Sequence, residues 1–253
     1  MTSFDDISLA YDNTIDWKAR LDREMPFLLS LLENRKSPRV LDMACGSGRH
    51  SIELASHGFE VIGFDSSESM IKAANLHREE ERSTAQFIVA EMEDVADVVG
   101  GQFDLVICLG NSLALLNNIE SLKKVIESVY GLLREGGSFI AQVLNFEEIH
   151  WTGFRTFPTR KGLLSDGKEI TFARLFEHTD YPFSSTLVMS AFKEINDTWT
   201  SEVFTQKVLN LNYKSMRSIL EEVGFSDIRV YSDYEKNPLD QKNSRNMIIQ
   251  TVK

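Results

Sequence analysis

The hydrophobic pattern predicts alternating strands and helices over the first 144 residues. Short, nearly continuous apolar runs are typical of strands buried on both faces. Between them, apolar residues recur every three or four positions, as in amphipathic helices. The predicted strands are 39–44, 60–65, 86–92, 103–110 and 138–144. The predicted helices are 16–34, 50–58, 66–82 and 119–137, with Gly58 and Gly136 ending the second and the last. This order predicts parallel βα units with right-handed crossovers.

The pattern changes between residues 145 and 212. Segments 170–178, 186–195 and 199–211 alternate roughly in period two and contain aromatic residues, which predicts antiparallel strands. A helix at 213–225 and strands at 227–234 and 247–252 then resume the first pattern. The sequence therefore predicts an α/β core with a small antiparallel β insertion after its fifth strand. The expected division is an N-terminal helical lid segment (1–36), a core (37–145 and 208–253) and an insertion (146–207).

Composition narrows the class of protein. The chain has 253 residues, 42% of them apolar, and a formal net charge of −11. This charge argues against a nucleic-acid partner, because nucleic-acid binders usually present a basic face. Cys45 and Cys108 form neither a disulfide framework nor a zinc spacing, so we expect a cytoplasmic protein without a metal. The N-terminus has no signal pattern, and no apolar run approaches the ~20 residues that cross a membrane.

The stretch VLDMACGSGRH (40–50) joins a predicted strand to a helix through a glycine turn. Such a turn offers backbone N–H groups to a ligand at the carboxyl end of the sheet. The third glycine of the dinucleotide fingerprint is missing, which disfavours an NAD dehydrogenase. Asp42 precedes the turn, and its charge would repel a phosphate. The turn therefore favours a cationic ligand, and S-adenosylmethionine carries a sulfonium and an ammonium.

The ends of the next strands carry matching chemistry. Asp65 ends the second strand, where a carboxylate can accept hydrogen bonds from ribose hydroxyls. Met92 and its acidic neighbours follow the third strand, near the expected adenine. Gly110 follows the fourth strand, where it allows close approach to a ligand, and Asn111 and Ser112 add polar groups.

With these motifs in order, the chain resembles a class I S-adenosylmethionine-dependent methyltransferase. More narrowly, it resembles the glycine/sarcosine N-methyltransferase group of small-molecule enzymes, through VLDMACGSGRHSIELASHGF, VIGFDSSESMIKAA, VICLGNSLALL and the upstream PFLLSLL. The resemblance implies a doubly wound, mostly parallel sheet of seven strands with the last strand antiparallel. It also implies that Leu109 and Gly110 flank the reacting methyl, and that Arg20 pairs with the methionine carboxylate. The predicted cofactor-binding residues are Tyr11, Trp17, Arg20, Asp42, Ala44, Cys45, Gly46, Ser47, Gly48, Asp65, Ser66, Met70, Glu91, Met92, Glu93, Leu109 and Gly110.

Two departures from the family concern the acceptor. The segment VLNFEEIH carries acids where the glycine enzymes have a carboxylate-binding arginine, and Leu115 replaces a histidine. Arg155 and Arg160 are the candidate replacements for that arginine, whereas Glu147 and Glu148 would instead attract a cationic amine.

The predicted function is methyl transfer from S-adenosylmethionine to a small molecule, giving S-adenosylhomocysteine. An amine nitrogen is the favoured acceptor, and Asn111 and Tyr11 are the candidate catalytic residues that position the reactants. O- or C-methylation and a non-catalytic cofactor-binding module are the alternatives. The expected partner is a small-molecule substrate, with no nucleic acid and no membrane, and the expected assembly is a monomer or homodimer. The two cysteines are interpreted as packing residues and His50 as a local hydrogen-bonding residue. The aromatic residues of the insertion form either its own core or a substrate cage.

Overall fold

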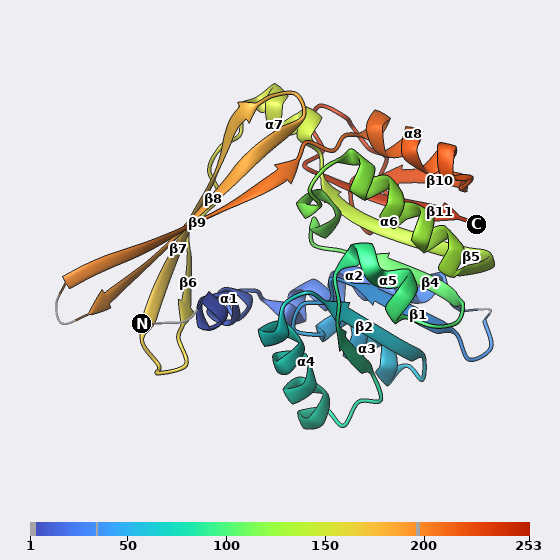
Figure 1. Ribbon diagram of the computed structural model, residues 1–253, viewed down its shortest axis with the longest axis horizontal. Coiled ribbons are helices and arrows are strands. Elements are labelled where there is room, and N and C mark those ends of the chain that lie inside the picture. Colours follow the sequence, from blue (N-terminus) through green and yellow to red (C-terminus); the bar gives the residue numbers. More distant parts are fainter. Residues whose placement is uncertain (1–3, 34, 196–197) are drawn as a thin grey trace.

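The protein contains two sheets, and the larger one is the predicted core (Figure 1). The computed structural model describes residues 4–33, 35–195 and 198–253. The larger sheet has the strand order β10-β11-β5-β4-β1-β2-β3. Its strands are β1 (Arg39–Met43), β2 (Glu60–Asp65), β3 (Gln86–Val89), β4 (Phe103–Cys108), β5 (Leu133–Leu144), β10 (Ser226–Tyr231) and β11 (Asn246–Val252). The strand β11 runs antiparallel to both of its neighbours, β10 and β5, and the other neighbouring strands are parallel, which confirms the predicted doubly wound fold.

Helices cover both faces of this sheet, as its strand sequences require. They are α2 (Trp17–Ser30), α3 (Arg49–Ser56), α4 (Glu68–Glu80), α5 (Val95–Val98), α6 (Ile119–Leu132) and α8 (Tyr213–Val223). Along β4, Leu105 and Ile107 join the apolar cluster of α2 and α3. Val106 and Cys108 join the cluster of α6 and α8 on the opposite face. The unbroken apolar run of β4 therefore follows from burial on both sides.

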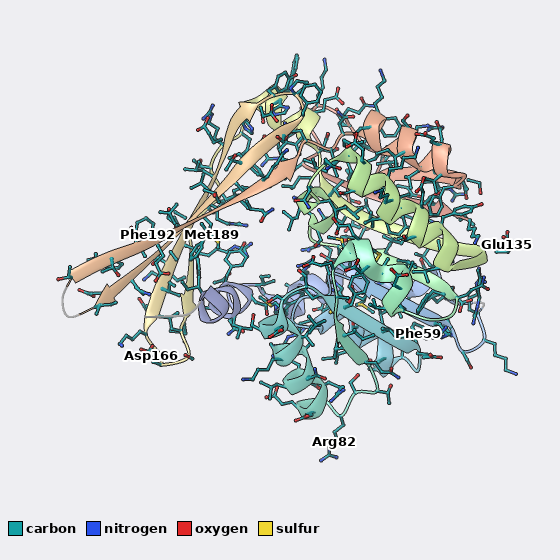
Figure 2. The ribbon with its side chains drawn as sticks, in the orientation of Figure 1. Phe59, Arg82, Glu135, Asp166, Met189 and Phe192 are labelled. Atoms are coloured by element: carbon teal, nitrogen blue, oxygen red, sulfur yellow. The ribbon has the colours of Figure 1, made fainter. Side chains whose placement is uncertain are left out.

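The predicted insertion forms a separate antiparallel sheet. Its strands are β6 (Arg160–Leu163), β7 (Glu169–Asp180), β8 (Ser184–Ile195) and β9 (Thr198–Leu209). The sheet extends away from the core as a long twisted arm, which carries Met189 and Phe192 (Figure 2). Segments 170–178 and 186–195 are confirmed as strands, and so is 199–211 except that β9 ends at Leu209. The strand β6 and the short helix α7 (Phe146–Thr152) were not predicted.

A further unpredicted helix, α1 (Phe4–Asp12), packs against this arm. Ile7 and Ala10 form a small buried cluster with Phe172 and Ala191 of the insertion sheet. The backbones of α1 and β6 also approach closely, because a Cβ on Gly162 would lie 2.5 Å from the Ala10 carbonyl oxygen. The predicted segment 1–36 thus contributes α1 to the arm and α2 to the core, while residues 1–3 and 34 lie outside the described part.

The predicted end of the fourth helix is wrong. The helix α6 ends at Leu132, and Leu133 already has extended backbone angles (φ −78°, ψ 141°). The reason is tertiary pairing, since Leu133 lies opposite Phe103 of β4. Gly136 therefore belongs to β5, where its N–H donates to the Lys253 carbonyl. Gly58 does follow the helix α3 with the positive φ expected of a helix end.

The turn after β1 depends on glycine for two different reasons. Gly46 and Gly48 both have positive φ, at 55° and 78°. A Cβ on Gly48 would lie 2.6 Å from Phe87 Cζ and 2.8 Å from Ala74 Cβ, whereas a Cβ on Gly46 would meet nothing within 4 Å. Gly48 is thus required by packing as well as by backbone angle, while Gly46 leaves its side of the turn open.

This difference predicts unequal costs for two matched substitutions. Gly46→Ala should lower the free energy of unfolding by about 1–2 kcal/mol, the cost of a left-handed alanine. Gly48→Ala should lower it by a further ~1–3 kcal/mol because the methyl group overpacks against Phe87 of β3 and Ala74 of α4. Denaturant unfolding of both variants measures the difference, and equal losses would show that the packing around Gly48 is not the constraint described here.

Candidate cofactor and substrate site

Two cavities open near the carboxyl ends of the parallel strands, where ligands of doubly wound sheets bind. From β1 the chain proceeds outward to β2 and β3, then returns to place β4 on the other side of β1. The smaller cavity has a volume of about 340 Å³ and the larger about 870 Å³. Leu115 lines both, so they are adjacent.

Asp65 is the central polar group of the smaller cavity. Its Oδ2 accepts a hydrogen bond from the Gly46 N–H (2.9 Å), and its Oδ1 accepts one from the Ser67 N–H (2.9 Å). Each carboxylate oxygen can accept more than one bond, so Asp65 keeps acceptor capacity toward the cavity. Ser67 also caps α4 by accepting the Met70 N–H, which fixes the turn that carries Asp65.

Other predicted residues share this cavity. The predicted lining residues found there are Ala44, Asp65, Ser66, Glu91, Met92 and Glu93. Ala44 has a positive φ of 53°, which brings the backbone of the turn toward the cavity. Gln206 of β9 also lines it, so one wall comes from the insertion. The mixture of carboxylates, backbone and a thioether fits a ribose and an aromatic base.

The larger cavity gathers predicted residues of both reactants. Tyr11, Arg20 and Gly110, predicted to bind the cofactor, line it together with Asn111 and Arg160, predicted to bind the substrate. Arg20 lies over the Trp17 ring at 4.9 Å, and its Nη2 would be 3.7 Å from a Cβ on Gly110. The Gly110 N–H donates to Gln142 Oε1 (2.8 Å), and Asn111 Oδ1 accepts the Leu144 N–H (2.8 Å). The loop after β4 is therefore held by β5.

A buried glutamate, which the sequence analysis missed, organises the cationic side of this cavity. Glu24 accepts hydrogen bonds from Arg20 Nε (3.1 Å) and Arg23 Nη2 (2.8 Å), and its Oε2 lies 2.8 Å from His50 Nε2. Burial acts to raise the pKa of Glu24, but His50 and the two arginines outweigh it and hold the pKa below its ordinary value. The local hydrogen-bonding role expected for His50 is confirmed. Glu24 lies four residues after Arg20 on one helix, a spacing that could have revealed the pair.

Several predicted residues lie outside the lining of both cavities. These are Trp17, Asp42, Cys45, Gly46, Ser47, Gly48, Met70, Leu109 and Arg155. Asp42 is buried beneath the turn, accepts the Ser51 hydroxyl (2.7 Å), and has its pKa raised by burial. Burial also raises the pKa of the Cys45 and Cys108 thiols, in agreement with packing roles.

Two acceptor expectations need correction. Arg155 is exposed and pairs with Glu177 (3.1 Å), because its segment runs beside β7, where the Phe176 N–H donates to the Arg155 carbonyl. Glu148 is buried against Arg245, so its charge is already compensated. Neither side chain is available to an acceptor in the larger cavity.

The insertion supplies lining residues that local sequence pattern could not reveal. Arg174 and Phe157 line the larger cavity, as do Asp233 and Tyr234 from the segment after β10. The place of Arg174 depends on the register of β7, and the places of Asp233 and Tyr234 depend on the return of the chain toward α2. The sequence around these residues gives no sign of either.

Comparisons with known proteins agree with this geometry. A methyltransferase-domain family matches residues 40–137. A glycine/sarcosine N-methyltransferase from Parasynechococcus marenigrum is 28% identical over 240 residues, covering 92% of this chain and 79% of that protein. A glycine N-methyltransferase from Oryctolagus cuniculus is 33% identical over 151 residues, covering 54% and 51%. An S-adenosylmethionine-dependent methyltransferase from Clostridium acetobutylicum has the same fold, with a TM-score of 0.77, 17% identity and coverage of 94% and 92%.

The fold and the paired cavities, together with these similarities, define a methyltransferase. The chain is a class I S-adenosylmethionine-dependent methyltransferase, as its motifs predicted. S-adenosylmethionine is its methyl donor. No described helix is long and apolar enough to cross a membrane. Among the described residues, no three histidine, cysteine, aspartate or glutamate side chains gather as metal ligands do.

The Glu24 network predicts a specific pH dependence of stability. Since the folded-state pKa of Glu24 is below the ordinary value of 4.5, its stabilisation is present above that pH and is lost as pH falls through the folded value. Glu24→Gln should therefore be less stable than the parent at pH 7, and the gap should narrow below pH 4.5. Denaturant unfolding of the parent and the variant from about pH 3 to about pH 7 measures the difference in their free energies of unfolding.

The matched control is Glu53→Gln. Glu53 also lies beside a histidine, His57, but both side chains are more than 40% exposed. This variant should follow the parent's pH profile, because exposed ion pairs contribute little. A Glu24→Gln gap that stays constant with pH would contradict the assigned network.

Proposed function

We propose that this methyltransferase acts on the nitrogen of a small-molecule amine. The observation that carries the proposal is the pair of adjacent cavities: one is lined by acids suited to adenosine, and the other has room for a second reactant. The names of similar proteins support the choice of nitrogen, since they include glycine/sarcosine N-methyltransferases and an amino pentose methyltransferase from Micromonospora echinaspora. That last protein shares the fold at a TM-score of 0.70 and 15% identity.

In the proposed arrangement the smaller cavity holds the adenosine part of the donor. Asp65 accepts hydrogen bonds from the ribose hydroxyls, and Met92 packs against the adenine between Glu91 and Glu93. The turn at Ala44 and Gly46 lies against the methionine part. Arg20, held by Glu24, faces the donor's carboxylate from the larger cavity.

The bound donor supplies an electrophilic methyl group on a sulfonium, so the protein's own task is alignment. Gly110 leaves room beside Leu109 for the two reactants to approach in line. Asn111 and Tyr11 position the acceptor, with Asn111 fixed by β5 and Tyr11 carried in by α1. Holding two reactants together in this way can lower the activation free energy by about 7–11 kcal/mol.

The remaining expectations belong to the same proposal. We propose a cytoplasmic enzyme without a nucleic-acid partner, because the chain carries a net charge of −11 and both cysteines are free and buried. We propose a monomer or homodimer. O- and C-methylation use the same cavities and are outcomes of the tests below.

The adenosine placement predicts the effect of Asp65→Ala on cofactor binding. The variant loses charge-assisted hydrogen bonds worth ~1.5–3 kcal/mol, so the Kd for S-adenosylmethionine should rise about 10- to 100-fold. Isothermal titration measures it, with the exposed Asp97→Ala as the control for loss of a nearby charge. An unchanged Kd in Asp65→Ala would refute the ribose placement.

The proposed reaction predicts turnover of S-adenosylmethionine to S-adenosylhomocysteine with small primary or secondary amines. A panel of amines, with glycine and sarcosine included, should be compared with matched alcohols and enols in a coupled assay. Turnover with alcohols or enols alone would replace N- by O- or C-methylation. Tight donor binding with no turnover on any acceptor would instead favour a non-catalytic binding module.

A further inference from the structure

A buried hydroxyl in the wall of the larger cavity has no hydrogen-bond partner among the described residues. Tyr234, in the segment after β10, is 9% exposed and lines this cavity. Of the buried polar atoms that lack a partner in the described part of the chain, only the Tyr234 hydroxyl belongs to a residue that lines either cavity. Burying a donor without a partner costs free energy, so its place beside a cavity favours a ligand that accepts its hydrogen bond.

Packing and a tight turn hold this hydroxyl in place. The Tyr234 ring lies edge-on to Phe27 of α2, with the ring centroids 5.7 Å apart, and belongs to the apolar cluster of α2 and α3. The preceding residue, Asp233, closes the turn by accepting the N–H groups of Glu235 (3.0 Å) and Asn237 (3.2 Å). The hydroxyl is therefore positioned before a ligand arrives, which lowers the ordering cost of binding.

The surroundings of this hydroxyl keep it a neutral donor and disfavour an anionic ligand. Burial raises the pKa of Tyr234, and of the nearby charges the Glu24 carboxylate raises it most. Arg20 and Arg23 act to lower that pKa, each with a smaller effect. Glu24 and Asp233 both line the cavity together with Tyr234, so an anion bound against the hydroxyl would face two carboxylates. An uncharged oxygen accepts the same hydrogen bond without this repulsion.

The core strands add uncharged polar groups to the same cavity. Gln142 of β5 accepts the Gly110 N–H through Oε1 (2.8 Å) and donates through Nε2 to Asn246 Oδ1 (3.1 Å). Both amide side chains line the cavity. This part of the lining therefore carries hydrogen-bonding groups without a charge, in keeping with a ligand that bears hydroxyl or carbonyl groups.

We infer that Tyr234 is a substrate-binding residue whose hydroxyl donates to an uncharged oxygen of the acceptor, so the acceptor is an amine that also bears a hydroxyl or carbonyl group. This inference rests on the proposed function, because it assigns the second reactant of the same site. The oxygen is separate from the reacting nitrogen, since that nitrogen must keep its lone pair for the methyl carbon. The cavity of about 870 Å³ has the size of sites for drug-sized ligands, so it admits an acceptor with both groups.

The test compares ring amines that differ in one substituent. The intact protein, saturated with S-adenosylhomocysteine, is titrated by NMR or calorimetry with cyclohexylamine and with the isomers of aminocyclohexanol, aminocyclohexanecarboxamide and aminocyclohexanecarboxylate. At least one alcohol or carboxamide should bind about fivefold or more tightly than cyclohexylamine, and Tyr234→Phe should remove that preference, because one hydrogen bond is lost. A preference for an alcohol assigns a hydroxyl, and a preference for a carboxamide assigns a carbonyl.

The matched control is Tyr231→Phe. Tyr231 also lies edge-on to Phe27, at 6.2 Å between centroids, but it is not part of the cavity lining, and its hydroxyl lies 3.5 Å from Gln250 Oε1. This variant should keep the parent's preference. Equal binding of all the amines, tighter binding of a carboxylate than of its carboxamide, or a Tyr234→Phe variant that keeps the preference overturns the inference. A parent that binds none of the amines overturns it as well.

Stability without ligand separates a binding role of the hydroxyl from a structural one. Because this hydroxyl has no partner among the described residues, Tyr234→Phe should unfold at the same denaturant concentration as the parent or at a higher one. A lower midpoint would assign the hydroxyl to the fold and contradict the binding role.

Two further measurements separate this inference from the proposed function. The Kd for S-adenosylmethionine should be the same in Tyr234→Phe as in the parent, and a higher Kd would place the hydroxyl against the donor and overturn the inference. Turnover of the ring amines is followed as S-adenosylhomocysteine formation. Turnover that shows no preference for an oxygen-bearing amine refutes the inference alone. Absence of turnover with every amine refutes the proposed function itself.

Discussion

The carboxylate of Asp65 joins two turns that begin at different strands, and the geometry of the site depends on this link. One oxygen accepts the Gly46 N–H from the turn after β1, and the other accepts the Ser67 N–H at the start of α4. These bonds fix the relative position of the two loops before any ligand arrives. A preorganised site avoids an ordering cost on binding. The same carboxylate lines the smaller cavity, so the group that builds the site is also available to its ligand.

Two buried acids near this link, Glu24 and Asp42, have pKa values that are shifted in opposite directions. Glu24 is surrounded by three cationic or potentially cationic side chains, which lower its pKa. Asp42 accepts a hydrogen bond from the Ser51 hydroxyl, and burial raises its pKa despite the more distant charges of His50 and Arg20. A buried carboxylate with such weak compensation costs stability.

The features that the sequence predicted depend on local position within one element. Asp65 was predictable because the end of an apolar strand is visible in the chain, and parallel strands place such ends at one edge of the sheet. The acceptor side was much less predictable. Arg155 and Arg160 are five residues apart, yet only Arg160 reaches the cavity, because β6 begins there. Arg174 sits in an alternating strand whose register is set by pairing with β8, and nothing in its neighbouring sequence distinguishes it. The end of α6 was misjudged for a similar reason, since the pairing of Leu133 with β4 overrides the helical pattern.

The net charge of the whole chain does not predict the charge of the acceptor, because the core and the insertion line different parts of the two cavities. A net charge of −11 describes the whole chain, but at physiological ionic strength charges are screened beyond ~8 Å. Inside the larger cavity Arg160 lies against the Tyr11 ring and Arg174 against the Phe157 ring. An acidic protein can therefore carry arginine side chains in the lining of a cavity. The smaller cavity is lined largely by the core, whereas the larger cavity also takes lining residues from the arm. In the proposed arrangement, differences in the arm's strands would therefore change the larger cavity more than the smaller one.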